Sequence, residues 1–223
     1  DGGLGDDVIA GGEGADVVAG GEGADQIAGG EGADQLLGGS GDDTIAGGIG
    51  DDSIDGGLGD DVIAGGEGAD QIAGGEGADT IDAGSGDDSV LGGSGDDTIL
   101  GQAGDDYLVG GLGSDSLDGG EGIDEIDYST DAASGGEAGV TVDLSSGTAT
   151  DGFGDSDTLS NIENVTATAE ADHLTGSDDA NIILGQAGDD VIAGRGGSDT
   201  IDGGAGIDEI DYSTDAASGG EAG

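Results

Sequence analysis

The sequence predicts an all-β fold, a β-solenoid of stacked 18-residue coils that is interrupted by a β segment lacking the repeat. Two observations predict this fold. Residues 2–127 form fourteen consecutive nine-residue units without insertion or deletion, and every unit has Asp in its sixth place and an aliphatic residue in its eighth. A unit too short to bury its apolar residue alone must stack on its neighbours, so the strict period favours a solenoid.

Each unit divides into a turn and a short strand. The first six places read Gly-Gly-x-Gly-x-Asp, and glycines permit the positive φ angles that tight turns require. The last three places read as a strand, with the eighth side chain inward and the seventh and ninth outward. Two units complete one coil, so we expect odd-numbered units in one parallel sheet and even-numbered units in the other.

The period breaks at Tyr128, and this break organises the chain. We expect four parts: a regular block at 1–127, an interrupting β segment at 128–157, a second block at 158–211 that is degenerate at its start, and the start of a second copy of the interrupting segment at 212–223. Within the interrupting segment, the alternation in residues 140–144 (VTVDL) predicts a strand with one buried face.

A longer repeat overlies the nonapeptide. Residues 203–223 repeat residues 119–139 with one substitution, at an offset of 84 residues. Gln102 and Gln186, which both replace a second-place Gly, obey the same offset. Asp1 fits the ninth place of a preceding unit, so we expect the chain to be a piece of a longer array.

Composition narrows the possible partners. The chain has 223 residues, 53 acidic side chains and one basic one, Arg195, for a formal net charge of −52. Such a charge is typical of a disordered acidic tail, but both the apolar residues and the carboxylates are phased, so we expect folding that depends on a hard cation. Contacts with phosphate need Lys and Arg, which argues against nucleic acid and anionic membrane surfaces as partners. The absence of Cys removes thiolate metal sites, and no apolar run is long enough for membrane insertion.

The sixth-place aspartates are the candidate metal ligands. Backbone carbonyls of a glycine-rich turn and a carboxylate are hard oxygen donors, and Ca²⁺ takes about six to eight of them, more than one turn supplies. We therefore expect each ion between the turns of units n and n+2, for example between Asp7 and Asp25 or between Asp16 and Asp34. The candidates are Asp7, Asp16, Asp25, Asp34, Asp43, Asp52, Asp61, Asp70, Asp79, Asp88, Asp97, Asp106, Asp115, Asp124, Asp190, Asp199 and Asp208.

The pattern G-G-x-G-x-D-x-U-x, with U aliphatic, resembles the RTX or hemolysin-type calcium-binding repeats. The match is continuous over residues 2–127 and less regular over residues 158–211. The resemblance implies a parallel β-roll with calcium in the turns, in a large secreted bacterial protein exported by a type I secretion system.

From this we expect a non-enzymatic, calcium-binding structural β-roll of an extracellular or cell-surface repeat protein, of surface-layer, filament or adhesin type, which folds on calcium binding after export. The alternative is a folding and secretion module of a type I secreted toxin or enzyme. Calcium is the expected partner, together with other copies of the chain or a cell-surface matrix.

Several residues have competing interpretations. Fifth-place aspartates make paired carboxylates, but their repetition argues against an acid/base active site and favours solvated or outer charges. His173 is expected outward at the surface, and Tyr128 and Tyr212 are expected to cover the last aliphatic residues of a block. The units beginning at Thr158 and Ala167 lack the turn glycines, so we expect few or no ions there.

Overall fold

The computed structural model of the chain describes residues 1–131, 135–136 and 138–211. The chain divides into two compact units, residues 1–125 and 126–223, and each is described by itself. The second copy of the interrupting segment expected at 212–223, with Tyr212, lies outside the described residues. Within the described part of the chain, no helix has the length and apolar character needed to cross a membrane.

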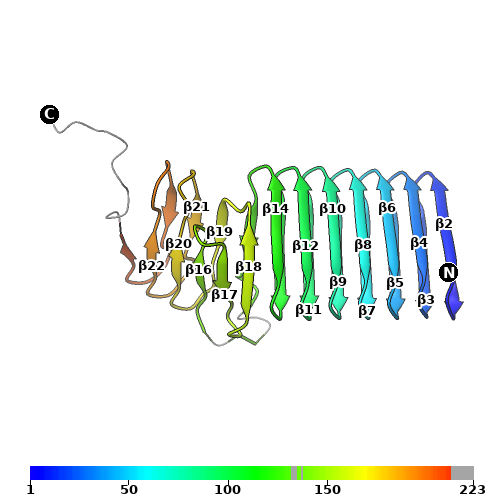
Figure 1. The fold of residues 1–223 in the computed structure, drawn as a ribbon, viewed down its shortest axis with the longest axis horizontal. Helices are drawn as coiled ribbons and strands as arrows, with labels where there is room; N and C mark the ends of the chain where they lie inside the picture. Colours follow the sequence, from blue (N-terminus) through cyan, green and yellow to red (C-terminus); the bar gives the residue numbers. More distant parts are fainter. Residues whose placement is uncertain (132–134, 137, 212–223) are drawn as a thin grey trace. The chain divides into compact units, whose positions relative to one another are not determined.

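The first unit is a parallel β-roll of two sheets (Figure 1). Odd-numbered repeat units supply one sheet and even-numbered units the other, as predicted from the period. One sheet contains β1 (Gly3–Leu4), β3 (Val17–Glu22), β5 (Gln35–Ser40), β7 (Ser53–Leu58), β9 (Gln71–Glu76), β11 (Ser89–Ser94) and β13 (Tyr107–Leu112). The other contains β2 (Val8–Glu13), β4 (Gln26–Glu31), β6 (Thr44–Ile49), β8 (Val62–Glu67), β10 (Thr80–Ser85), β12 (Thr98–Ala103) and β14 (Ser116–Glu121).

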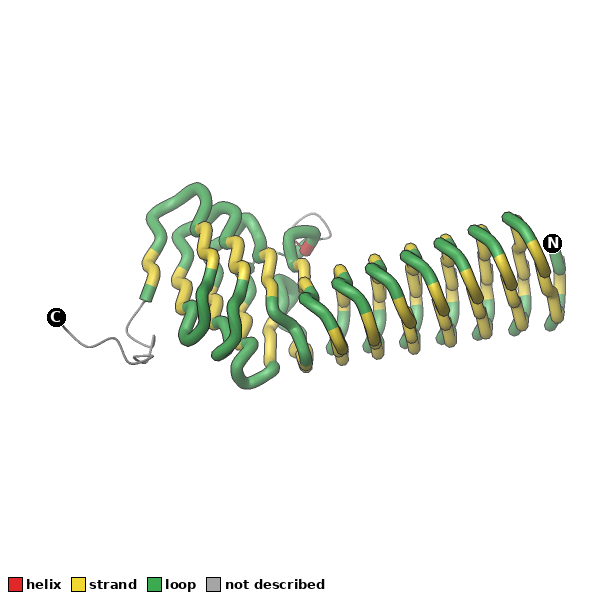
Figure 2. The backbone as a smooth tube through the Cα atoms, turned by 90° about the horizontal axis from the view of Figure 1, so that it is seen from above, coloured by secondary structure: helices red, strands yellow, loops and turns green. Residues whose placement is uncertain are grey.

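The register confirms the predicted 18-residue coil. Each residue pairs with the residue 18 positions later, as Ile27 does with Ile45, and Ile45 with Ile63. The eighth-place side chains therefore stack inside the roll, and Ile45, Ile63 and Ile81 are at most 1 % exposed. The remaining eighth-place residues from Val18 to Leu117 are also buried. Figure 2 shows the resulting succession of strands and turns along this unit.

The strands of the first unit are longer than predicted. From β2 to β14 they span six residues, from the seventh place of one repeat to the third place of the next, so the expectation of three-residue strands is wrong here. The reason lies in the first two glycines. A Cβ on the buried Gly65 would lie 2.3 Å from the Ala83 carbonyl oxygen, and Gly66 has a φ of +120°. Without side chains, this stretch stays extended and the backbones of adjacent coils stack closely.

The second unit contains the interrupting segment and the degenerate block. β15 (Glu125–Asp127) spans the boundary between the units. β17 pairs antiparallel with both β16 and β18. β16 also pairs in parallel with β20, and this pairing joins the interrupting segment to the degenerate block. The strands are β16 (Thr141–Asp143), β17 (Thr148–Thr150), β18 (Ser156–Ser160), β19 (Asn164–Thr166), β20 (His173–Thr175), β21 (Ile182–Leu184), β22 (Val191–Ala193), β23 (Thr200–Asp202) and β24 (Glu209–Ile210).

Two sequence predictions fall in this segment. The strand expected at residues 140–144 is present as β16, with Val140 and Val142 each 1 % exposed. Tyr128 is buried, and its hydroxyl donates a hydrogen bond to Asp157 Oδ2 at 2.9 Å. The tyrosine thus ties the start of the interrupting segment to β18, a contact that the sequence did not indicate.

Candidate functional site

The sixth-place aspartates of the first unit stand in two columns, one on each side of the roll. The 18-residue register places every second unit on the same side. From Asp25 onward these side chains are at most 3 % exposed. The first column is Asp7, Asp25, Asp43, Asp61, Asp79, Asp97 and Asp115, and the second is Asp16, Asp34, Asp52, Asp70, Asp88, Asp106 and Asp124. We refer to these two sets as the aspartate columns.

From Asp25 onward, one oxygen of each column carboxylate accepts a hydrogen bond from the preceding coil. The backbone N–H of Asp70 donates to Asp88 Oδ1 at 2.7 Å, and the N–H of Asp88 donates to Asp106 Oδ1 at 2.8 Å. The same bond, at 2.7 or 2.8 Å, recurs along both columns. The pairs predicted to share an ion, such as Asp7 and Asp25, are therefore direct neighbours.

The other oxygen, Oδ2, is buried without a hydrogen-bond donor in most members of the columns. It packs against the first glycine of its own repeat, since a Cβ on Gly65 would lie 2.5 Å from Asp70 Oδ2. A buried carboxylate oxygen without a partner is strongly unfavourable unless a positive charge compensates it. The Oδ2 atoms in this situation include those of Asp7, Asp16, Asp25, Asp34, Asp43, Asp52, Asp61, Asp70, Asp79, Asp88, Asp97, Asp106 and Asp190.

The pKa values of several column members in the middle of the roll reflect this cost. Burial raises the pKa of Asp61 to about 6 and the pKa of Asp88 and Asp97 to about 7. The hydrogen bond from the preceding aspartate lowers these pKa values, and the charges of neighbouring aspartates raise them further. The fold thus holds carboxylates where their charged form is disfavoured. A bound cation has the opposite effect, because it stabilises the charged form.

The donor set fits calcium better than a metal that prefers nitrogen or sulfur ligands. Among the described residues, no three His, Cys, Asp or Glu side chains converge into a metal-binding group. Two carboxylates from stacked turns must therefore be complemented by backbone carbonyls and water. Calcium accepts such an all-oxygen set in flexible geometry. The orphaned Oδ2 atoms and the oxygen-rich turns fit this ion.

The fifth-place aspartates have a role that sequence reasoning missed. Asp60 Oδ1 accepts the backbone N–H of Ala78 at 2.9 Å, and Asp51 Oδ1 accepts that of Ala69 at 3.0 Å. All eight fifth-place aspartates bond to the coil that follows, namely Asp6, Asp42, Asp51, Asp60, Asp87, Asp96, Asp105 and Asp189. These exposed side chains therefore link adjacent coils and are not purely solvated charges. The 18-residue coil places the backbone N–H of the residue 18 positions later beside each of them, and this register could have revealed the bond.

The second block departs from this pattern at its start. Asp172 accepts hydrogen bonds from Thr168 through both oxygens, and its Oδ1 also accepts the N–H of Val140 at 2.7 Å. Asn181 donates its side-chain amide to the Glu163 carbonyl at 2.7 Å. The Asp172 carboxylate, in one of the two units where few or no ions were expected, and the Asn181 amide of the next unit thus find partners within the protein itself.

The regular pattern returns further along the block. The N–H of Asp172 donates to Asp190 Oδ1 at 2.9 Å, and that of Asn181 to Asp199 Oδ1 at 3.0 Å. The N–H of Asp190 donates to Asp208 Oδ1 at 3.2 Å. Asp190 is buried like the column members of the first unit, whereas Asp199 and Asp208 are partly exposed.

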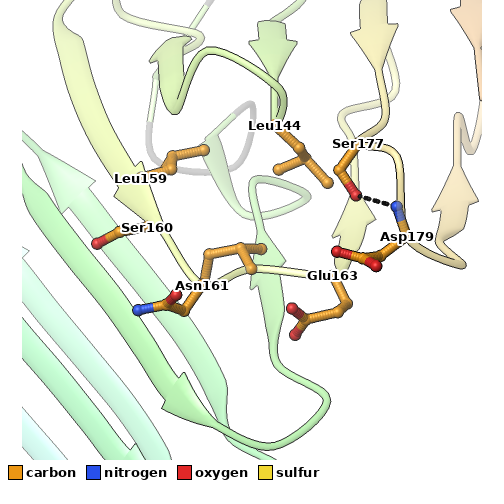
Figure 3. A pocket seen from close by; sticks show the side chains of 8 residues that line it. Leu144, Leu159, Ser160, Asn161, Glu163, Ser177 and Asp179 are labelled. Atoms are coloured by element: carbon orange, nitrogen blue, oxygen red, sulfur yellow. Dashed lines mark hydrogen bonds between the residues drawn. The ribbon is translucent and has the colours of Figure 1, made fainter. Parts of the chain in front are cut away.

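A cavity of about 200 Å³ lies between two degenerate turns of this block (Figure 3). Glu163 and Asp179 line it from neighbouring turns, beside Ser177, whose hydroxyl accepts the Asp179 N–H at 3.2 Å. The lining has no basic side chain, and the volume is below the roughly 300 Å³ typical of small-molecule sites. His173 is exposed on β20, as predicted.

Comparison with known families agrees with the geometry. The model of the RTX calcium-binding nonapeptide repeat, in its four-copy form, matches residues 1–36, 28–63, 37–72, 55–90, 64–99, 91–126, 157–192 and 175–210. No curated protein matches the chain. The matches cover well over half of the sequence and coincide with the two blocks whose turns present the sixth-place aspartates. The chain belongs to the family of RTX calcium-binding nonapeptide-repeat proteins, and its fold is their β-roll.

Proposed function

We propose that the chain is a non-enzymatic structural module of an extracellular or cell-surface repeat protein, and that it folds when it binds calcium. The observation that carries this proposal is the set of buried, donorless Oδ2 atoms in the aspartate columns, in a chain with one basic side chain. Carboxylates placed in this way need an external cation for the compact state to be stable.

The proposed ligands are the sixth-place aspartates of both blocks. Each ion would take carboxylate oxygens from two successive members of a column, with backbone carbonyls and water completing its shell. The bound ion supplies positive charge that neutralises the column. The chain's own part is to orient each carboxylate through the Oδ1 hydrogen bond, as Asp70 orients Asp88. A first-place glycine such as Gly65 leaves room for Oδ2 against the backbone, where a Cβ would clash with it.

The proposed mechanism couples binding to folding. Where calcium is scarce, repulsion within a chain of net charge −52 keeps it expanded. Extracellular calcium modules have dissociation constants of about 10⁻⁴ to 10⁻³ M, which separates the cytoplasm from the exterior. This supports an extracellular location, with folding after export through a type I pathway.

Two kinds of parent protein fit such a module. The 84-residue super-repeat favours a structural array, as in a surface layer, filament or adhesin, which would contact other copies of itself or a cell-surface matrix. Gln102 and Gln186 support a true structural repeat, because both adopt a left-handed φ, of 78° and 67°. The second candidate is the folding and secretion module of a type I secreted toxin or enzyme.

Circular dichroism of the full chain, with excess calcium and then with excess chelator, tests the function. We expect an ordered β spectrum and a compact hydrodynamic radius in calcium, and loss of both after chelation. Magnesium at equal concentration is the matched control and should restore little order, because it demands stricter octahedral geometry. A β spectrum that is unchanged by chelation contradicts the proposal.

A further inference from the structure

Four buried aspartates of the second unit lie outside the nonapeptide turns. Asp127, Asp131, Asp151 and Asp157 are 7, 3, 2 and 3 % exposed, respectively. They come from two segments, residues 127–131 and 151–157, which contact each other at two points. The Tyr128 hydroxyl donates to Asp157 Oδ2 at 2.9 Å, and the Gly152 N–H donates to Asp131 Oδ2 at 3.0 Å.

Asp151 has an orphaned oxygen like those of the columns. Its Oδ1 accepts the backbone N–H groups of Phe153, Gly154 and Asp155 at 3.0, 2.7 and 2.8 Å. The loop of residues 151–155 therefore wraps around Oδ1. Oδ2 is buried and has no hydrogen-bond partner. One oxygen of this carboxylate is therefore held by three backbone amides, whereas the other has no hydrogen-bond partner.

Asp131 places a second carboxylate beside the same loop. Because it accepts the N–H of Gly152, it lies at the first peptide bond after Asp151. Burial raises the pKa of Asp131 to about 6, and the charges of Asp151, Asp157 and Asp127, in that order, raise it further. The two carboxylates thus repel each other in a buried place.

No basic side chain compensates this charge. Arg195, the one basic side chain of the sequence, donates to Ser145 Oγ at 2.8 Å and pairs with Asp178 at 3.7 Å. Buried like charges of this kind are stable when they share a proton or coordinate a cation. The orphaned oxygen of Asp151 favours the cation, because a cation supplies the positive partner that this buried oxygen lacks.

We propose that Asp151 and Asp131 directly hold a divalent cation, with calcium as the chemical fit, at a site in the interrupting segment that is separate from the nonapeptide turns. Since no three acidic side chains converge among the described residues, backbone oxygens and water complete the shell. Asp127 and Asp157 contribute charge. The ion would clamp the segment after β15 to the loop between β17 and β18.

A crystal structure of the full chain grown in calcium, with anomalous difference maps, tests the site directly. We expect a calcium peak about 2.3 to 2.6 Å from Asp151 Oδ2. Peaks in the nonapeptide turns with none at Asp151 overturn this inference and leave the proposed function standing. The absence of peaks anywhere overturns both, so the two failures are distinguishable.

Terbium luminescence excited through tyrosine tests the site in solution. Because Tyr128 bonds to Asp157, a Tb³⁺ ion at this site should be sensitised by its ring. Asp151→Asn retains the Oδ1 acceptor, and we expect it to lower the emission of the full chain to the level of Tyr128→Phe. Asp143→Asn is the matched control, since Asp143 accepts the Ser145 and Ser146 amides in a similar loop but is partly exposed; its emission should stay at the wild-type level. Unchanged emission in Asp151→Asn overturns the inference.

Discussion

Replacing Asp88 by Asn should have opposite effects on the calcium-bound and calcium-free protein. Asp88 lies inside its column, between Asp70 and Asp106, so it takes part in two of the proposed sites. Asn retains the Oδ1 acceptor for the Asp70 amide but replaces Oδ2 with an N–H₂ donor, which cannot bind a cation. Asp88→Asn should therefore lose ion binding while keeping the coil-to-coil hydrogen bond.

The magnitude follows from linkage. At 10 mM calcium and a dissociation constant of about 10⁻⁴ M, one site contributes about 2.7 kcal/mol to the free energy of unfolding. Loss of the two sites that share Asp88 should then lower that free energy by up to about 5 kcal/mol. In the presence of chelator the sign reverses, because burial raises the pKa of Asp88 to about 7 and the neutral amide removes an unfavourable charge.

The assay is a calcium titration followed by circular dichroism, combined with urea unfolding at 10 mM calcium. We expect Asp88→Asn to raise the calcium concentration needed for half-maximal folding. Asp87→Asn is the matched control, because Asp87 is exposed and its amide variant retains the bond to the Asp105 N–H. Its effect should stay within about 0.5 kcal/mol, as for most surface changes. Equal effects of the two variants would refute the assignment of the columns as ligands.

Three further predictions follow from the same structure. Gln102→Gly should stabilise the calcium-bound protein by about 1 kcal/mol, because Gln102 has a φ of 78°; Gln102→Ala keeps the Cβ and should give no gain in thermal unfolding. Ile99→Ala should cost about 2 to 5 kcal/mol in urea unfolding, since Ile99 is fully buried, and a cost below about 1 kcal/mol contradicts a packed ladder. Without calcium, stability should rise as the pH falls. Burial raises the pKa of Asp97 to about 7, so the folded state binds protons more tightly than the unfolded state, whose Asp pKa is about 3.9. The gain should be complete below about pH 4 and lost as the pH rises through 7, as followed by circular dichroism; a flat profile contradicts it.

The period alone was sufficient to predict the coil and its two sheets. Because every unit repeats one inward aliphatic residue, the pairing of Ile27 with Ile45 follows from counting. The strand limits did not follow, since Gly65 and Gly66 read as turn residues by their conformational freedom. Their lack of side chains also permits close stacking of extended backbones, and local propensity does not distinguish these two uses of glycine.

The candidate site was predictable to the same degree. The sixth-place aspartates and their neighbours along each column follow from the repeat. The burial of one oxygen of Asp70 against Gly65 does not, because it depends on backbone geometry. Nor could the sequence bring Asp131 beside Asp151, since that contact arises from the antiparallel path of the interrupting segment and has no period to reveal it.

The sixth-place aspartates on one side of a roll form a series, such as Asp172, Asp190 and Asp208, and the two ends of a series need different hydrogen-bond partners. At the start of this series, the Val140 N–H donates to Asp172 Oδ1. In each such series the amides donate towards the C-terminal side and the carboxylates accept from the N-terminal side. A segment placed ahead of a block therefore needs to present one backbone N–H to the first carboxylate of each series, which every residue except proline has, and this chain contains no proline. A segment placed after a block must instead bring an acceptor at a defined spacing. The entrance and the exit of a block therefore place different demands on the segments that join it.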